Sequence, residues 1–279
     1  MSSNHLMLNE LMNKPSTADN ATRWNEWKTN VLSESMRTFK ERHPWFHFKK
    51  QDLYNNLSEK CHIPQVLYTG APSGIASTLQ HLDHNIVIKK TTGHSSKEVL
   101  VLQKTQDQWH CLLTNEKHSC MTLMKWAQGG EVLIEESLGC IEEPIPLDFK
   151  CYIANGKAQI IAVINRNTSI TTLNYFKSTD LKKIDLSEIF LAPPKAWIQN
   201  NTTTSMNLRS RIELAKLEAE RIASTNLNCD GLLVSLDMYV QPVPTGYKTW
   251  LGEITPRPGA LHSNWLKKEF IEDLLSKLE

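Results

Sequence analysis

The chain has 279 residues, of which 40% are hydrophobic and 22% charged, and its formal net charge at pH 7 is +1. This length supports one large domain or two small ones with a sizeable core. The near-zero charge gives no overall field that favours nucleic acid or an anionic membrane. No apolar run approaches the roughly 20 residues that a membrane span needs, so neither partner is expected.

The start of the chain and its cysteines favour a cytoplasmic location. The first residues lack the basic stretch and the continuous apolar run of a secretory leader. The six cysteines are scattered, without a Cys-x-x-Cys pair. We therefore expect buried or free thiols rather than disulfides or a cysteine metal site.

Two helices are expected before the first strands. Apolar residues at helical spacing predict them over 22–42 and 49–60. The aromatic residues between them are expected to pack onto a sheet. Residues 61–68 are expected to be a loop that enters a short strand, and a loop with a short helix follows over 71–84.

The next strand, over 85–90, ends in Lys89 and Lys90, and a small-residue loop over 91–96 leads to another strand over 98–102. Loop amides and hydroxyls can cradle phosphate oxygens, and a lysine at the strand end adds positive charge. With one glycine and no following helix, the loop is not a P-loop. A plain hairpin turn with solvated lysines stays open as the alternative.

A hairpin is expected in the middle of the chain, after a short helix within 116–129, a strand over 131–138 and a loop over 139–147. Its turn, Asn155-Gly156, is a strong hairpin signal between two apolar runs. Lys150 lies in the covered first strand and needs an anion, either Asp148 or a phosphate. With a two-residue turn, Lys150 and Arg166 point to opposite faces, and they converge only if the strand twists or bulges near Asn165.

The polar, proline-broken segment 177–207 is expected to be a long loop that could close over a site, or else a surface excursion. Helical spacing predicts a helix over 208–227 and a last one capped by Ser263. The apolar stripe of the last helix favours core packing and leaves a homodimer contact open.

The stretch 234–260 predicts a hairpin that carries Asp237 in one strand and Glu253 in the other. If Gln241 and Tyr247 close a five-residue loop, Asp237 lies opposite Leu251, and Glu253 is its diagonal neighbour about 7 Å away. Two carboxylates on such a face repel each other and resist desolvation. Mg²⁺, bound through carboxylates and substrate phosphates, would remove that cost. The alternative is that both acids sit at strand ends in water.

The order of these motifs resembles the ATP-grasp superfamily, and within it the TupA-like branch associated with teichuronopeptide and surface-polysaccharide genes. The motifs are the lysine strand with its loop, Ile134-Glu135-Glu136-Ser137-Leu138, Asp148-Phe149-Lys150, Asn165-Arg166, Leu236-Asp237 and Gly252-Glu253-Ile254-Thr255. The resemblance covers 50–258 and implies an α+β fold in which two sheet-containing lobes clamp ATP. It divides the chain into a helical amino-terminal segment (1–48) and an ATP-grasp domain (49–279), with a smaller lobe over about 85–135 and a larger one over about 136–279.

The resemblance also implies roles for individual residues. Phosphate contacts fall to Lys89 or Lys90 and to the loop residues Gly93, His94, Ser95 and Ser96. The adenine hinge would be Glu135, Glu136, Ser137 and Leu138, with Glu143 as the ribose ligand. Lys150, Arg166 and Arg257 would surround the transferring phosphoryl group, and the metal ligands would be Asp237, Glu253 and Thr255. Thr255 holds the position of the superfamily's asparagine, a stronger metal ligand.

The implied reaction is ATP- and Mg²⁺-dependent ligation of a carboxylate to an amine through an acyl phosphate, with release of ADP and phosphate. The substrates would be small-molecule, peptide or carbohydrate acids and amines. A full amino-terminal α/β domain is not found, so the acceptor site would be built differently or by another chain. Two alternatives stay open: a kinase of the same fold acting on a small molecule or sugar, and a non-catalytic nucleotide-binding partner protein.

Overall fold

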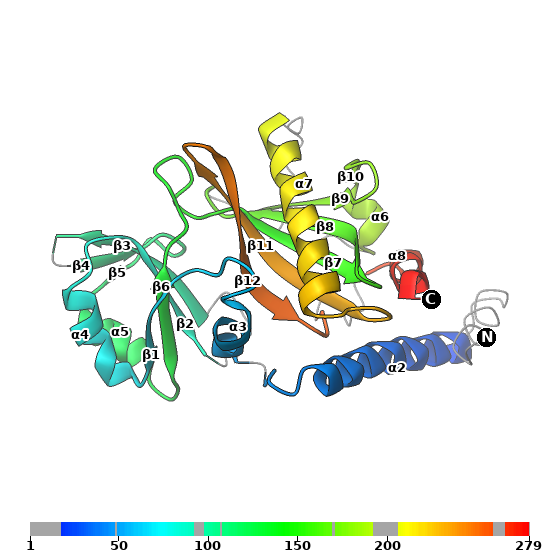
Figure 1. Cartoon of the computed structure of the whole chain (residues 1–279), viewed down its shortest axis with the longest axis horizontal. Coiled ribbons are helices and arrows are strands. Elements are labelled where there is room, and N and C mark those ends of the chain that lie inside the picture. Colours follow the sequence, from blue (N-terminus) through cyan, green and yellow to red (C-terminus); the bar gives the residue numbers. More distant parts are fainter. Residues whose placement is uncertain are drawn as a thin grey trace.

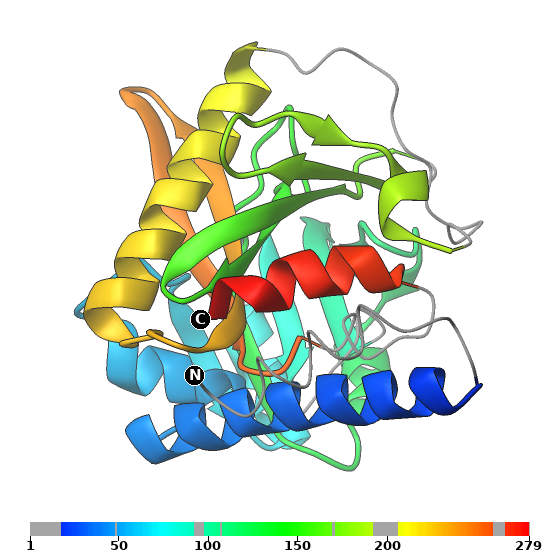
Figure 2. The ribbon, with the colours of Figure 1, turned by 90° about the vertical axis from the view of Figure 1, so that its right-hand side faces the viewer.

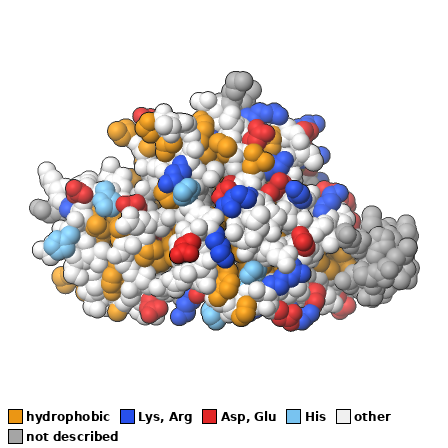
Figure 3. All heavy atoms as spheres, viewed as in Figure 1, with side chains coloured by type: hydrophobic (Ala, Val, Ile, Leu, Met, Phe, Trp, Pro, Cys, Tyr) orange, Lys and Arg blue, Asp and Glu red, His pale blue; other side chains and the backbone are white. Residues whose placement is uncertain are grey.

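The computed structural model describes residues 18–47, 49–91, 98–106, 108–168, 171–191, 206–258 and 266–278. It contains two six-stranded antiparallel sheets with helices packed around them (Figure 1). The α+β prediction is confirmed. No helix within these ranges is long and apolar enough to cross a membrane. Acidic and basic side chains are interspersed over the face shown in Figure 3, in keeping with the near-zero net charge.

The small-lobe sheet has the strand order β1-β6-β2-β3-β4-β5. Its strands are β1 (Val66–Gly70), β2 (Ile86–Lys90), β3 (Val99–Thr105), β4 (Gln108–Cys111), β5 (Lys117–His118) and β6 (Val132–Glu136). One face is covered by the turn η1 (Pro72–Gly74) and the helices α4 (Ile75–Gln80) and α5 (Cys120–Trp126), through Ile75, Leu79 and Leu123. The sequence did not predict β4 or β5, and this sheet begins at β1, before the predicted lobe limit of 85.

The large-lobe sheet has the order β10-β9-β8-β7-β11-β12. Its strands are β7 (Asp148–Ala154), β8 (Lys157–Asn165), β9 (Thr172–Lys177), β10 (Lys183–Ile184), β11 (Leu233–Val243) and β12 (Gly246–Thr255). The predicted Asn155-Gly156 turn joins β7 to β8, and both of its residues have positive φ (52° and 72°), as a type I′ turn requires.

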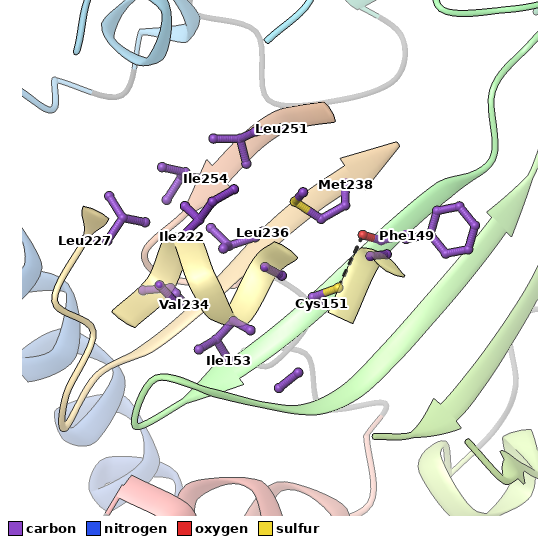
Figure 4. Close-up of a cluster of buried hydrophobic side chains, with 14 of the residues drawn as sticks. Phe149, Cys151, Ile153, Ile222, Leu227, Val234, Leu236, Met238, Leu251 and Ile254 are labelled. Carbon is purple, nitrogen blue, oxygen red and sulfur yellow. Dashed lines mark hydrogen bonds between the residues drawn. The ribbon is translucent and has the colours of Figure 1, made fainter. Parts of the chain in front are cut away.

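Helices cover both faces of the large-lobe sheet (Figure 2). On one face lie α3 (Lys50–Leu57) and α7 (Met206–Arg221), which continues as a π-helical turn over Ile222–Asn226. Their apolar side chains meet those of β7, β11 and β12 in one cluster, and Figure 4 shows part of it, with Ile222 beside Leu236. Ala215 and Ala219 of α7 are fully buried there, because small side chains let a helix approach a sheet closely. The other face packs against α2 (Ala18–Arg42), α6 (Leu186–Ile189), and α8 (Lys268–Leu275) with its 3₁₀ end η5 (Ser276–Leu278).

The prediction of a long loop over 177–207 is wrong for the part that the structure describes. Residues 177–191 contain the end of β9, the strand β10 and the helix α6, which Asp185 caps with a hydrogen bond from Ser187 N–H (2.7 Å). Ile189 and Phe190 are buried in the core. Residues 206 and 207 begin the helix α7. Residues 192–205, the loop residues Gly93, His94, Ser95 and Ser96, and the Ser263 cap lie outside the described residues.

Candidate active site

A cavity of about 540 Å³ lies between the two sheets. One part of its lining is apolar and includes Val99, Val101, Leu138, Ile145 and Ile164. The rest is charged, with five cationic and five acidic side chains: Lys50, Lys89, Lys150, Arg166 and Arg257, and Glu135, Glu136, Asp148, Asp237 and Glu253. A site with an apolar end and a balanced, charged end suits a ligand that has a flat apolar part and a polyanionic part.

A β-bulge in the β11–β12 hairpin brings the two predicted metal ligands together. From Val243↔Gly246 to Met238↔Leu251 the pairing is regular, and the next pair is Asp237↔Glu253, which leaves Gly252 unpaired. Without that extra residue Glu253 would point to the opposite face, because side chains alternate along a strand. The predicted five-residue loop is wrong, since a tight turn at Pro244-Thr245 closes the hairpin. Asp237 and Glu253 are direct rather than diagonal neighbours.

Gly252 also makes room for Tyr239, which lines the cavity. A Cβ atom at Gly252 would lie 2.4 Å from Cε2 of Tyr239 and 3.1 Å from its Cζ. The aromatic ring therefore occupies the space that a side chain at the bulge would need.

A second bulge brings Lys150 and Arg166 to the same face. The β7–β8 pairing shifts between Ile153↔Ala158 and Tyr152↔Ile160, so Gln159 is the extra residue. Beyond it, Lys150 pairs with Ala162, and both Lys150 and Arg166 line the cavity. The predicted condition of a bulge is met, but it lies beside the turn rather than near Asn165.

Lys150 is bonded to Asp237 on the neighbouring strand, so its anion is not the predicted Asp148. Burial alone lowers the pKa of Lys150, but the carboxylates of Asp237 and Asp148 outweigh it and raise that pKa above its ordinary value. Burial raises the pKa of Asp237 to about 6, against the opposing effect of Lys150 and with the help of Asp148 and Glu253. The two groups form a tightly coupled buried pair.

Asp148 is instead the partner of Arg166, whose two terminal nitrogens both donate to Asp148 Oδ2 (3.3 Å each). Asp148 is only 6% exposed, and its Oδ1 has no hydrogen-bond partner among the described residues. A buried carboxylate oxygen without a partner is costly. Asp148 is therefore a cavity residue in its own right, and the sequence suggested it only as a counter-ion.

Lys89 and Lys90 point to opposite faces of β2. Lys89 lines the cavity and pairs with Glu135 of β6. Lys90 lies on the face that packs against α5, with its ammonium 5.3 Å from the ring centre of Trp126. Strand alternation therefore separates the two candidates, and only Lys89 reaches the cavity.

The predicted adenine hinge runs along the end of β6. Within the described residues, Glu136 N–H donates to Gln65 O (3.0 Å) and Ser137 N–H to Asn85 O (3.1 Å). Glu136 and Leu138 line the cavity, whereas Ser137 does not. The side chain of Glu135 turns inward to Lys89 and is 2% exposed overall.

Glu143, the predicted ribose ligand, is held away from the cavity by other contacts. Arg211 of α7 donates to both of its oxygens (2.7 and 2.8 Å), and Leu147 N–H donates to one of them (2.8 Å). Arg211 also donates to Val240 O (2.6 Å) and is buried. Glu143 is thus a counter-ion of a buried arginine and is absent from the cavity lining.

Sequence reasoning missed two residues of α3, of which Lys50 lines the cavity and Tyr54 contacts the lining residue Glu135. Lys50 Nζ lies 3.3 Å from Glu253 Oε2, and the Tyr54 hydroxyl donates to Glu135. Both stand one turn apart on a short helix, and nothing in the local sequence distinguishes Lys50 from its solvated neighbour Lys49. The only available signal was that the resemblance begins at residue 50.

The donor set fits a hard cation that is completed by phosphate oxygens. Asp237 and Glu253 face each other across the bulge, and Thr255 follows on the same face and lines the cavity with Arg257. Among the described residues, no three His, Cys, Asp or Glu side chains are gathered as a complete metal site. Mg²⁺ usually takes one or two carboxylates, with the remaining ligands from substrate and water.

The sequence matches no family model and none of the curated proteins. Among solved structures, the chain is similar to the D-alanine–D-alanine ligase from Bacillus anthracis (TM-score 0.46, 18% identity, covering 83% of this chain and 66% of that one). It is also similar to the ATP-grasp ligase PsnB with a minimal precursor (0.42, 10%, 84% and 61%). A third similarity is to the ADP complex of PurK, an N5-carboxyaminoimidazole ribonucleotide synthetase (0.41, 12%, 76% and 45%). The chain thus spans about half to two thirds of the length of these proteins.

Proposed function

We propose that the chain is an ATP-grasp enzyme that joins a carboxylate to an amine at the expense of ATP. The observation that carries the proposal is the cavity between two sheets, with Lys89 on the small-lobe side and Lys150, Asp237 and Glu253 on the large-lobe side. This is the arrangement that the sequence resemblance implies for nucleotide phosphates and their metal. The apolar part of the same cavity suits the adenine base.

The charged residues divide into two roles. Asp237 and Glu253, with Thr255 beside them, would hold Mg²⁺, which when bound screens the charge of the phosphates. Lys89, Lys150 and Arg166 would donate to phosphate oxygens and stabilise the charge of the transferring phosphoryl group. Lys150 stays protonated at neutral pH because its pKa is raised, so it acts as a fixed positive charge.

The substrate carboxylate would attack the terminal phosphorus of ATP and release ADP. An amine would then attack the acyl phosphate, so that the C–N bond forms and phosphate leaves. No side chain has to act as a nucleophile in this scheme. Closure between the lobes excludes water, which would otherwise hydrolyse the acyl phosphate.

The finer assignments belong to the same proposal. The motif order supports the TupA-like branch and small-molecule, peptide or carbohydrate substrates, and the scattered cysteines support a cytoplasmic location. The division at residue 48 and the hinge role of residues 135–138 also rest on that resemblance. The apolar stripe of α8, with Ile271 and Leu274, is buried in the core of the large lobe, as core packing requires, and a homodimer would need another surface.

The test is ADP release from purified protein with Mg·ATP and hydroxylamine, across a panel of amino acids and uronic acids. ADP with a hydroxamate is the expected result, because hydroxylamine traps an acyl phosphate. ADP with a phosphorylated product and no hydroxamate would make the protein a kinase. Bound ATP without ADP under every condition would leave a non-catalytic nucleotide-binding protein.

Variants assign the reaction to the site. Asp237→Ala and Glu253→Ala should each abolish ADP release while the fold survives. Asp83→Ala is the matched control, because that carboxylate is 96% exposed and is not part of the cavity lining. Near-normal ADP production by both site variants would refute the metal assignment.

A further inference from the structure

The short helix α3 lies between the two sheets, beside β12 (Figure 1). It is fixed to the large lobe by Leu53 and Leu57, which are buried in that lobe's core. Asp52 holds its start by accepting hydrogen bonds from His47 N–H (2.6 Å) and Lys49 N–H (3.1 Å). Helix α3 is therefore a rigid part of the large lobe.

From this position α3 reaches the small-lobe sheet. Its first amide, Lys50 N–H, donates to Thr91 O (3.2 Å), just beyond the end of β2. One turn later the Tyr54 hydroxyl donates to Glu135 Oε2 on β6. Two hydrogen bonds thus tie α3 to the neighbouring strands β2 and β6, which carry Lys89 and Glu135.

Glu135 connects Tyr54 to Lys89. Its Oε2 accepts from the tyrosine, and its Oε1 pairs with the ammonium of Lys89. Glu135 is 2% exposed and Lys89 is 7% exposed. A buried ion pair stays in one geometry only when the remaining carboxylate oxygen is also satisfied. Tyr54 supplies that second contact, from the other lobe.

We propose that Tyr54 is a positioning residue, which acts through Glu135 to hold the Lys89 ammonium in place for the phosphates of the nucleotide. This inference rests on the proposed function, in which Lys89 binds phosphate. It goes beyond that function by making the placement of Lys89 depend on α3, a helix that is packed on the other lobe. The tyrosine, the glutamate and the lysine then form one unit that spans both lobes.

The test compares Tyr54→Phe, Lys89→Met and the double variant by the affinity for Mg·ATP in calorimetry. Tyr54→Phe should weaken binding about tenfold, as expected when a hydrogen bond to a charged group is lost. In the Lys89→Met background the same change should have no further effect, because its route to the ligand has been removed. Tyr68→Phe is the matched control, since that hydroxyl donates to Ala71 O (2.7 Å) and its ring packs on the α4 and α5 face of the sheet, opposite to the face of Lys89. Equal effects of Tyr54→Phe in both backgrounds would overturn the inference and leave a purely structural role.

A second measurement needs no nucleotide. After reductive ¹³C-methylation, the signals of Lys89 and Lys90 can be assigned by replacing each with arginine. In Tyr54→Phe the Lys89 signal should shift and that of Lys90, which lies over Trp126, should not. An unchanged Lys89 signal would overturn the inference. If the wild type binds no nucleotide, the proposed function is wrong. The Lys89 signal would still show whether Tyr54 positions the Lys89 ammonium.

Discussion

Substitution of Gly252 by alanine tests whether the bulge in β12 builds the site. The added Cβ would lie 2.4 Å from the Tyr239 ring, a distance that real Cβ atoms do not show. Either the ring turns into the cavity or the bulge flattens. In the second case Glu253 leaves the face of Asp237, because a shift of one residue reverses every side chain beyond it.

The size of the effect follows from the contact rather than from backbone strain, because φ of Gly252 lies outside the left-handed region. Overpacking of a well-filled interior costs about 1–3 kcal/mol. For a chain near this size that lowers the melting temperature by roughly 2–4 °C per kcal/mol. The loss of one of two carboxylates should weaken the metal-dependent part of nucleotide binding much more than it weakens the fold.

The assay is calorimetric binding of ATP with and without Mg²⁺, combined with thermal unfolding followed by circular dichroism. Gly130→Ala is the control, since a Cβ there meets no atom within 4 Å. We expect Gly252→Ala to lose most of the Mg²⁺-dependent gain in affinity and Gly130→Ala to keep it. If Gly252→Ala unfolds at the wild-type temperature and keeps the full gain, the bulge does not set the site.

Three further predictions concern the charged residues. Lys89→Met should weaken ATP binding at least tenfold, whereas Lys90→Met, on the other face of β2, should leave it within twofold, and a reversed order in calorimetry would contradict the strand assignment. Glu143→Ala should lower the free energy of unfolding in urea by about 3 kcal/mol, because it leaves the buried Arg211 without its counter-ion, and it should leave the ATP affinity unchanged. A variant with full stability and lower ATP affinity would support the ribose role instead. The pKa of Asp237 is raised from 3.8 to about 6, so the folded state binds the proton of this carboxyl more tightly than the unfolded chain does. The resulting stabilisation of the fold is complete below about pH 4 and is lost as the pH rises through 6. Relative to Asp237→Asn, the wild type should lose about 3 kcal/mol of unfolding free energy over that range, and a flat difference would contradict the shift.

The sequence was sufficient for most of the elements that build the sheets. Asn155-Gly156 predicted the β7–β8 turn because few other dipeptides tolerate two positive φ angles. Alternation and helical spacing gave the strands around Lys89 and Asp237 and the helix α7. The strands β4 and β5 were missed because they are short and polar, and an edge pairing of a few residues leaves almost no periodicity.

Partners distant in the chain could not be predicted. Asp148 was the obvious counter-ion for Lys150 because it is two residues away, yet the structure pairs Lys150 with Asp237 and Asp148 with Arg166. Glu143 was predicted as a pocket residue because it follows the hinge, but it forms an ion pair with the buried Arg211 of α7. The partners of Lys150 and Asp148 depend on which strands are neighbours in the sheet, and the partner of Glu143 depends on where α7 packs. Neither arrangement is written in local sequence.

The two bulges explain why residues of the predicted motifs line the cavity although the strand pairing assumed for their hairpins was wrong. In a regular antiparallel pair, the face of every side chain follows from the turn alone. Each hairpin of this site has a tight turn whose regular register would send one functional side chain, Arg166 or Glu253, to the core face. An extra residue in the second strand of each hairpin, Gln159 or Gly252, reverses the face before that side chain is reached. Both the apolar core and the charged cavity can then share the same strands. With these tight turns, Glu253 and Arg166 can reach the cavity only if their strands contain the bulges. A change that removes one bulge should therefore also remove the side chain beyond it from the cavity.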